Sequence, residues 1–344
     1  MTDKKQSITE QAKGFYKKHK TLIYLVLVVL LFLLPTVVTK NSTRGILCRV
    51  LMYTILAGSL NVINGYSGQF SLGHAGFFCI GAYVEAILAT RFGFNFFPLL
   101  LLSGITAAIV GVLVCLPTLR LQGIYLSFVT IGFSEVIRII ALNWTKVTNG
   151  AQGIKNIPTP SAFGFAFKGT GKFYYIFLVV AVTFVFCTNR VINSRIGRAW
   201  MSLREDTAAA RSLAVKASWY KATNFAYGAF WAGVAGALYS PYMKYIESTV
   251  FSLDEGFKVL SMVVVGGMGT LGGPIVGSVI ITMLTEGLRF AGLYRMVLYS
   301  ILIIAIMWIR PQGLFGASDS VLSGGKRLFK KKKGTAEGKE DRQE

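Results

Sequence analysis

The sequence is poor in the residues that enzymes and metal sites use. Its 344 residues include only 2 His and 4 Cys. The cysteines show no paired spacing and lie in or beside apolar stretches: Cys48, Cys79, Cys115 and Cys187. Neither a disulfide framework nor a zinc or histidine metal site is indicated, and we predict that the cysteines are small packing residues. The lack of clustered His, Cys or carboxylate groups disfavours a membrane enzyme.

A phosphate-binding loop is also absent. Such a loop needs the pattern GxxxxGK[ST], whose backbone amides cradle phosphate while the Lys neutralises it. The glycine-rich residues 266–273 (GGMGTLGG) supply flexible backbone but no following Lys-Ser or Lys-Thr. If ATP drives transport here, another subunit must bind it. We therefore predict no cofactor and no covalent chemistry in this chain.

Charge is scarce, and apolar residues are abundant. Only 15% of residues are charged, 53% are hydrophobic, and the mean hydropathy is +0.56. Several continuous apolar runs approach the length of a membrane span, which favours helices over the alternating strands of a barrel. We predict an all-α polytopic membrane protein with spans at residues 22–38, 46–63, 70–90, 97–116, 124–144, 173–187, 222–242, 256–265, 274–288 and 297–309.

These runs correspond to about ten spans, or to eight and a re-entrant hairpin formed by residues 256–288. The formal charge of +21 is concentrated beside the spans, at residues 4–20, 194–216 and 326–333. Basic clusters in such places mark the cytoplasmic face and attract anionic lipid, so we expect a bilayer and not nucleic acid as the partner. The predicted organisation is a cytoplasmic tail at 1–21, a membrane domain at 22–309 and a second cytoplasmic tail at 310–344.

Residues 194–216 interrupt the apolar pattern with six Arg, Lys or Asp side chains. Each would cost roughly 2.5 to 3.5 kcal/mol near the centre of a span, which keeps the segment out of the bilayer. Trp200, Leu203, Ala210 and Leu213 or Ala214 nevertheless recur at intervals suited to one helix face. We predict one short amphipathic helix in the cytoplasm.

Polar residues within the spans are the candidates for a pathway or gate. Residues 61–81 contain five glycines and the side chains Asn61, Asn64, Ser67, Gln69 and His74. Spacing alone fits a pathway and close helix packing equally well. Glu135 and Arg138 are predicted to pair at i, i+3, either structurally or in gating. Glu85 is expected to snorkel or to be paired.

Four separated segments resemble the permeases of branched-chain amino acid ABC importers. They are residues 61–83 (NVINGYSGQFSLGHAGFFCIGAY), 123–140 (GIYLSFVTIGFSEVIRII), 194–206 (SRIGRAWMSLRED) and 263–277 (VVVGGMGTLGGPIVG). The resemblance extends over residues 46–315 and is strongest to the longer of the two permease subunits. It implies a type II importer fold in a prokaryotic inner (cell) membrane, with both termini in the cytoplasm.

The resemblance also implies the partners: a second homologous permease, two cytoplasmic ATPases that bind ATP and Mg, and an external binding protein that delivers leucine, isoleucine or valine. Residues 194–216 would contain the helix that docks into an ATPase, with coupling residues Arg198, Arg204, Glu205, Asp206 and Arg211. Thr207 and Ala214 depart from the family pattern, which has an acidic residue and a later glycine there.

Two other functions fit the residues. One is an importer of urea, short amides or another amino acid, because specificity in such systems rests largely with the binding protein. The other is a secondary transporter or channel in which Glu135 and Arg138 act as coupling groups.

Overall fold

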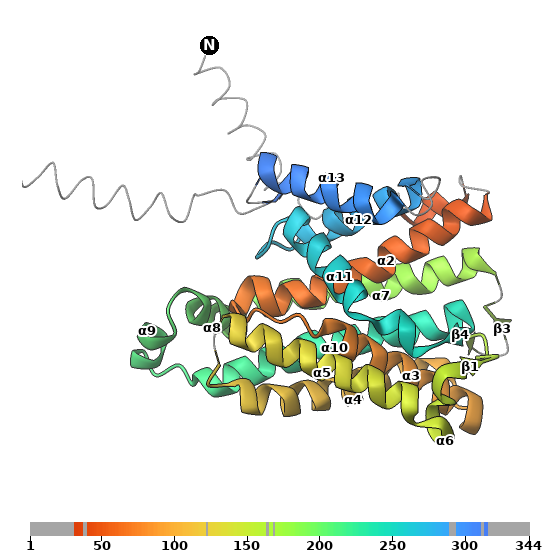
Figure 1. Cartoon of the computed structure of the whole chain (residues 1–344), viewed down its shortest axis with the longest axis horizontal. Helices are drawn as coiled ribbons and strands as arrows, with labels where there is room; N and C mark the ends of the chain where they lie inside the picture. The colour runs from red at the N-terminus through yellow and green to blue at the C-terminus, as the bar shows by residue number, and fades with distance from the viewer. Residues whose placement is uncertain are drawn as a thin grey trace, which may run out of the picture.

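The computed structural model describes residues 31–36, 40–121, 123–162, 165–167, 169–288, 294–310 and 313–315. The described chain runs back and forth between two ends of a helical bundle (Figure 1). We call the end that carries α8 (Arg195–Glu205) and α9 (Thr207–Ser212) the α8 end, and the opposite end, where the short strands lie, the strand end. The predicted tail at 1–21 and most of that at 310–344 lie outside the described residues.

Long apolar helices dominate the described part of the chain. They are α2 (Asn41–Asn61), continued by a π-helical turn, η1 (Val62–Tyr66), then α3 (His74–Phe92), α4 (Phe96–Thr118), α5 (Ile124–Asn143) and α7 (Thr170–Ile192). Five helices among the described residues, with α2 and η1 taken as one, are long and apolar enough to cross a membrane. The chain is therefore a multi-pass membrane protein, as its composition predicts.

A sixth long helix, α10 (Ala217–Met243), lies in the middle of the bundle and packs against α3 and α4. Its 27 residues would extend about 40 Å. Small residues let the backbones approach closely, and a Cβ built on Gly81 of α3 would lie 2.1 Å from the carbonyl oxygen of Gly233. Such contacts replace the hydrophobic effect as the main source of helix association in a bilayer.

Short elements close the strand end. They are α6 (Thr145–Thr148), η2 (Gly150–Gln152), β1 (Ile154–Lys155), β2 (Ser161–Ala162), β3 (Phe165–Ala166), β4 (Tyr245–Ile246) and η3 (Ser248–Phe251). β1 pairs antiparallel with β4, with Ile154 opposite Ile246, and β2 pairs antiparallel with β3. The predicted all-α class is thus correct apart from these two-residue strands.

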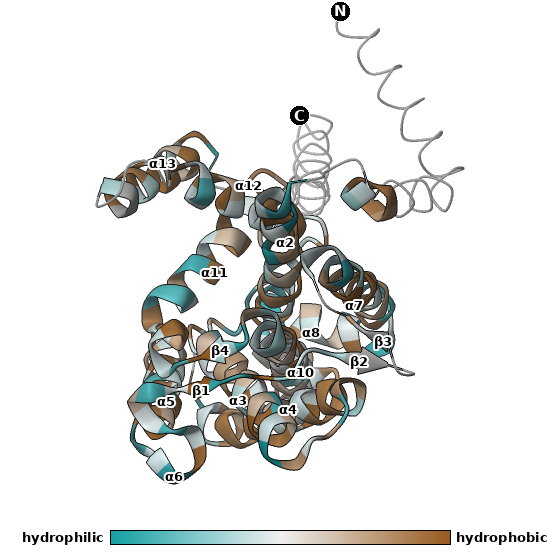
Figure 2. Ribbon diagram, turned by 90° about the vertical axis from the view of Figure 1, so that its right-hand side faces the viewer, coloured by the Kyte–Doolittle hydropathy of each residue, from teal (hydrophilic) through white to brown (hydrophobic). Residues whose placement is uncertain are grey.

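Two short helices form a hairpin beside α2: α11 (Leu253–Gly266) and α12 (Gly273–Gly287). With 14 and 15 residues they extend only about 21 and 22 Å, less than the ~30 Å of a hydrocarbon core. α13 (Arg295–Ile309) follows, and the chain then returns to the hairpin turn, where the Leu314 amide donates to the Val265 carbonyl. Figure 2 shows α11 and α5 on the same side of the molecule.

Every predicted span from residue 46 onward contains a helix, although residues 70–73 of the span predicted at 70–90 form a loop before α3. Of the predicted span at 22–38, the structure describes residues 31–36, which are helical. The helix predicted at 173–187 is longer than expected, because polar residues at both ends of α7 continue the helical turn. The number of complete crossings stays a prediction.

The prediction of one helix over residues 194–216 is wrong. α8 ends at Glu205, and Asp206 adopts extended backbone (φ −155°, ψ 113°) before α9 begins. The reason is local: the Asp206 carboxylate accepts hydrogen bonds from the Ala208 and Ala209 amides (2.7 and 3.1 Å) and so caps a new helix. Trp200, Leu203 and Ala210 are buried as predicted, but Leu213 is 79% exposed and Ala217 takes its place in the small apolar cluster.

Candidate coupling and pathway site

Asn61, the last residue of α2, fastens the turn between α11 and α12. Its Nδ2 donates to the Thr270 carbonyl (2.8 Å), and its Oδ1 accepts from the Gly269 amide (2.9 Å). The two bonds use both ends of one buried amide side chain, so the register between α2 and the turn is defined. The glycine-rich segment at 266–273 therefore lies at the α8 end, where α2 ends.

Asn64 and Gln69 hold the loop that follows the π-helical turn. Asn64 makes two 3.0 Å bonds to the backbone of Ser71, one as donor and one as acceptor. Gln69 donates to Ser67 Oγ (2.6 Å) and, at 3.4 Å, to Asn224 of α10. All of these side chains are buried within the chain. Their hydrogen bonds hold the loop against α2 and α10, and a role in the pathway stays a prediction.

His74 opens α3 and is also buried. Its Nε2 lies 2.7 Å from Ser59 Oγ of α2, and its ring meets Phe77 edge-on. Glu85, farther along α3, does not snorkel, because it is 1% exposed and accepts a hydrogen bond from Ser240 of α10. Both polar groups connect α3 to a neighbouring helix.

Arg204 connects α8 to the membrane helices. Its guanidinium donates to the Gly65 carbonyl at the π-helical turn. A Cβ built on Gly269 would lie 2.5 Å from Arg204 Nη1, and one on Gly68 would lie 3.0 Å from Arg204 Cγ. The side chain thus lies in a seam between three segments that are far apart in sequence: the end of α2, the following loop and the hairpin turn.

α8 has a second anchor on α10. Trp200 is 1% exposed, and its Nε1 donates to the Tyr220 carbonyl (2.9 Å). Arg198, Glu205, Asp206 and Arg211 are exposed on the other side of the segment. Arg204 is exposed as well, but unlike these four residues it also donates a hydrogen bond to the Gly65 carbonyl.

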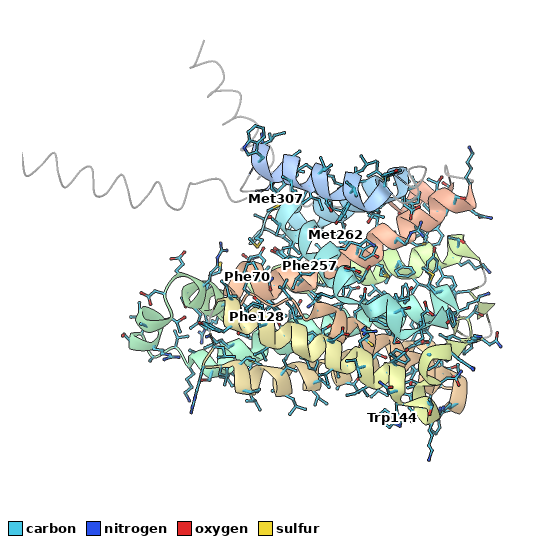
Figure 3. All side chains as sticks on the ribbon, viewed as in Figure 1. Phe70, Phe128, Trp144, Phe257, Met262 and Met307 are labelled. Atoms are coloured by element: carbon cyan, nitrogen blue, oxygen red, sulfur yellow. The ribbon has the colours of Figure 1, made fainter. Side chains whose placement is uncertain are left out.

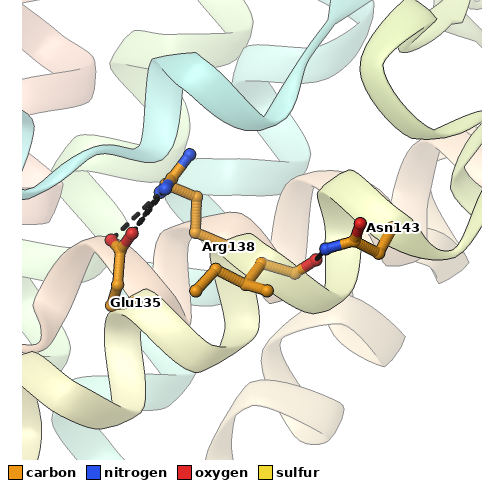
Figure 4. A network of polar contacts seen from close by, with 4 residues as sticks. Glu135, Arg138 and Asn143 are labelled. Atoms are coloured by element: carbon orange, nitrogen blue, oxygen red, sulfur yellow. Dashed lines mark hydrogen bonds and ion pairs between the residues drawn. The ribbon is translucent and has the colours of Figure 1, made fainter.

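Glu135 and Arg138 form the predicted ion pair on one face of α5 (Figure 4). Arg138 Nε lies 2.9 and 3.0 Å from the two carboxylate oxygens of Glu135. The side chains are 41% and 22% exposed, so this pair is not enclosed by the bundle. Glu135 is the twelfth of the 20 residues of α5, close to the middle of the span.

A second charged cluster was not predicted. Tyr53 of α2 donates to Glu255 Oε1 (2.6 Å) and accepts from Lys258 Nζ (2.5 Å), and Lys258 also lies 3.6 Å from Glu255. The Lys258 ammonium stands 4.2 Å from the centre of the Tyr53 ring. The only signal in the sequence was the i, i+3 spacing of Glu255 and Lys258, because Tyr53 is 202 residues away from Glu255.

Within the described residues, no group of three or more His, Cys, Asp or Glu side chains could hold a metal ion. The arrangement at the α8 end can instead transmit movement. α8 is fastened through Trp200 to α10 and through Arg204 to α2, and α2 is fastened through Asn61 to the hairpin turn.

Residues 42–307 match the family described as the branched-chain amino acid transport system permease component. The high-affinity branched-chain amino acid transport system permease protein LivM of Escherichia coli K12 is 35% identical over 318 residues, covering 86% of this chain and 75% of that protein. The permease protein LivH of the same strain is 25% identical over 292 residues, covering 78% of this chain and 92% of LivH.

A probable LivM permease of Methanocaldococcus jannaschii is 23% identical over 314 residues, covering 76% of this chain and 90% of that protein. No solved structure matches the chain. The family match and the identity to LivM extend over most of the bundle described above, so the chain belongs to the permease family of branched-chain amino acid transport systems.

Proposed function

We propose that this chain is one permease subunit of an ATP-driven importer of leucine, isoleucine and valine, and that residues 194–216 dock on a cytoplasmic ATPase. The chain supplies half of the translocation pathway, and a related permease supplies the other half. Its similarity to both LivM and LivH supports such a pair. Two ATPases and an external binding protein complete the importer, whose α8 end faces the cytoplasm with both termini.

The observation that carries the proposal is the seat of Arg204 between the π-helical turn and the hairpin turn. Closure of the ATPases moves α8 through its exposed residues, among them Arg198 and Glu205. Arg204 passes that movement to Gly65, and Asn61 carries it on to the α11–α12 turn. Contacts farther along α2, including Thr54 with Ser278 of α12 (2.7 Å), make α2 and the hairpin move together.

The exchange of charge between Arg204 and Glu205 tests this coupling. In the importer reconstituted in liposomes, we expect Arg204→Glu with Glu205→Arg to lower leucine uptake about tenfold or more while ATP hydrolysis continues. The matched control is Arg195→Gln, an exposed residue of the same helix with no contact to the seam. Normal uptake per ATP in the double variant would contradict the docking role.

The substrate is tested separately with loaded binding proteins. Leucine-, isoleucine- or valine-loaded protein should stimulate ATP hydrolysis by the reconstituted importer, whereas a urea- or amide-loaded homologue should not. Stimulation by the latter alone would replace the proposed substrate. Transport without any ATPase subunit would favour a secondary transporter.

A further inference from the structure

The outward face of α11 is polar. Asp254 and Phe257 are exposed, Lys258 and Ser261 are partly exposed, and the opposite face, including Val259, is buried. Positions 254, 257, 258 and 261 recur at helical spacing, so they form one stripe, which we call the α11 stripe. It combines a carboxylate, an ammonium, a hydroxyl and one large aromatic side chain.

The α11 stripe begins near the middle of the bilayer. Its neighbour Tyr53, which bonds to Glu255 and Lys258, is the thirteenth of the 26 residues of the span Asn41–Tyr66. At about 1.5 Å per residue, Tyr53 is therefore roughly 18 Å from each end of that span. Figure 3 likewise shows Phe257 near the middle of the bundle's length, whereas Trp144 lies close to the strand end.

Contact with lipid would be unfavourable for the α11 stripe. Ionisable groups at mid-membrane depth are costly and normally face a bundle interior or a water-filled cavity. The Glu255 and Lys258 side chains keep 17% and 25% of their surface exposed, and Asp254 has no hydrogen bond or ion pair with any described residue. An unpaired carboxylate at this depth requires water or a cationic ligand.

Resting on the proposed function, we propose that the α11 stripe is the part of the translocation pathway that binds the charged groups of the amino acid, with Asp254 on the ammonium and Lys258 on the carboxylate. The residues stand at i, i+4, so their Cβ atoms are about 6 Å apart on one helix face. A zwitterion fits this spacing, because its two charges are separated by one carbon atom. Phe257, between them on the same stripe, offers an apolar surface to a branched side chain.

The ion pair on α5 extends the same surface. α5 contacts α11, both lie on one side of the molecule in Figure 2, and Glu135 is also close to the middle of its span. Lys258 is already held by Glu255 and Tyr53, so a passing carboxylate competes with an existing pair instead of meeting a free ammonium. That competition keeps binding weak enough for release, as conduction requires.

Substitutions at Asp254 separate a charge role from a structural one. Asp254→Asn keeps the shape and removes the charge, whereas Asp254→Glu keeps the charge and changes the shape. We expect Asp254→Asn to lower leucine uptake by about tenfold or more, because one charged hydrogen bond to the substrate is lost. Asp254→Glu should retain most of the uptake. Both variants should keep the ATP hydrolysis that leucine-loaded binding protein stimulates. Uptake that is normal with Asn, or lower with Glu than with Asn, would overturn the proposal.

The matched control is Glu286→Gln on α12. Glu286 is partly exposed (24%) and pairs with Arg49 of α2 at 2.7 Å, but it does not belong to the α11 stripe. Uptake by this variant should stay within about twofold of the native value, because a partly exposed ion pair contributes little net stability. A loss equal to that of Asp254→Asn would overturn the proposal, because any charge lost from this region would then have the same effect.

Accessibility supplies an independent test. Ser261→Cys in the reconstituted importer should react with a water-soluble, membrane-impermeant thiol reagent, with the native chain as the unlabelled background. Reaction only with a lipid-soluble maleimide would place the α11 stripe against lipid and overturn the proposal. Failure of the proposed function would give a different result. Leucine-loaded binding protein would then stimulate neither ATP hydrolysis nor uptake in the unsubstituted importer.

Discussion

At the α8 end, Ala214 adopts left-handed backbone although it is not glycine, whereas Gly269 is one of several glycines there with positive φ. Ala214, after α9, has φ +60°, and Gly269, in the hairpin turn, has φ +76°. This backbone conformation suits glycine best, which fits the glycine that the resemblance described above implies at this position. Ala214 therefore adopts this conformation at a cost that glycine would not have.

Replacing Ala214 by glycine should stabilise the protein. A left-handed alanine costs about 1 to 2 kcal/mol, and glycine loses about 0.5 to 1 kcal/mol more entropy on folding, so the net gain is about 0.5 to 1 kcal/mol. The thermal midpoint of the purified importer should rise slightly. Ala208→Gly, at an exposed position inside α9, should have the opposite sign, and a lower midpoint for Ala214→Gly would refute the argument.

Gly269→Ala should have a larger effect, because backbone and packing are both unfavourable. The new Cβ would stand 2.5 Å from Arg204 Nη1, so the guanidinium would have to leave the Gly65 carbonyl. We expect a loss of about 1 to 3 kcal/mol together with weaker coupling of ATP hydrolysis to uptake. Gly272→Ala is the control, since its Cβ would meet nothing within 4 Å and its φ is −79°. Equal effects of the two variants would argue against the Arg204 seam.

At the scale of elements, one side chain determines how the coupling segment is divided. Asp206 ends α8 and caps α9, so the two helices can take different directions. The apolar spacing could not reveal this, because Leu203 and Ala210 fall on one predicted stripe whether or not the helix is continuous. Local hydrogen bonding by Asp competes with a continuing helix.

Asp206→Ala should loosen α9 without unfolding the bundle. Removing such a cap costs about 1 kcal/mol, and a helix of 6 residues has little other support. Hydrogen exchange at the amides of Ala208 and Ala209 should become faster, whereas Asp206→Ser, which keeps a capping oxygen, should stay close to the native rate. Unchanged exchange in the alanine variant would mean that packing of Ala210 alone holds α9.

The helices could be predicted because the backbone of an apolar run in a bilayer must form its hydrogen bonds within the run, and a helix does so. Ends were less predictable: residues 70–73 form a loop because Asn64 binds Ser71, a contact that composition does not encode. The polar residues of the site were found, but not their partners. Glu255 and Asp254 were missed because the span predicted at 256–265 began after them, and Tyr53 meets Glu255 only in the fold.

For the whole molecule, the two ends of the bundle differ in chemistry. Arg211 and its neighbours are exposed at the α8 end, while the strand end carries the β1–β4 pair with Lys155. The hairpin turn belongs to the α8 end, since Asn61 bonds to Thr270 and Arg204 lies against Gly269. The chain thus runs along α11 to the α8 end, turns there and returns along α12, whichever side of the membrane the α8 end faces.

Cysteine labelling in sealed vesicles tests both the end and its side. With an impermeant thiol reagent, we expect Thr270→Cys and Arg211→Cys to react in inside-out vesicles, because basic clusters remain on the cytoplasmic side, and Lys155→Cys to react in right-side-out vesicles. Cys48, Cys79 and Cys115 are buried and Cys187 is partly exposed, so labelling of the native chain is measured as the background. If Thr270→Cys reacted in the same vesicles as Lys155→Cys, the hairpin turn would be at the strand end and the Asn61 and Arg204 contacts would be wrong. If all three reacted from the opposite sides, the contacts would hold but the orientation would be reversed, and an ATPase could not reach α8 from the cytoplasm.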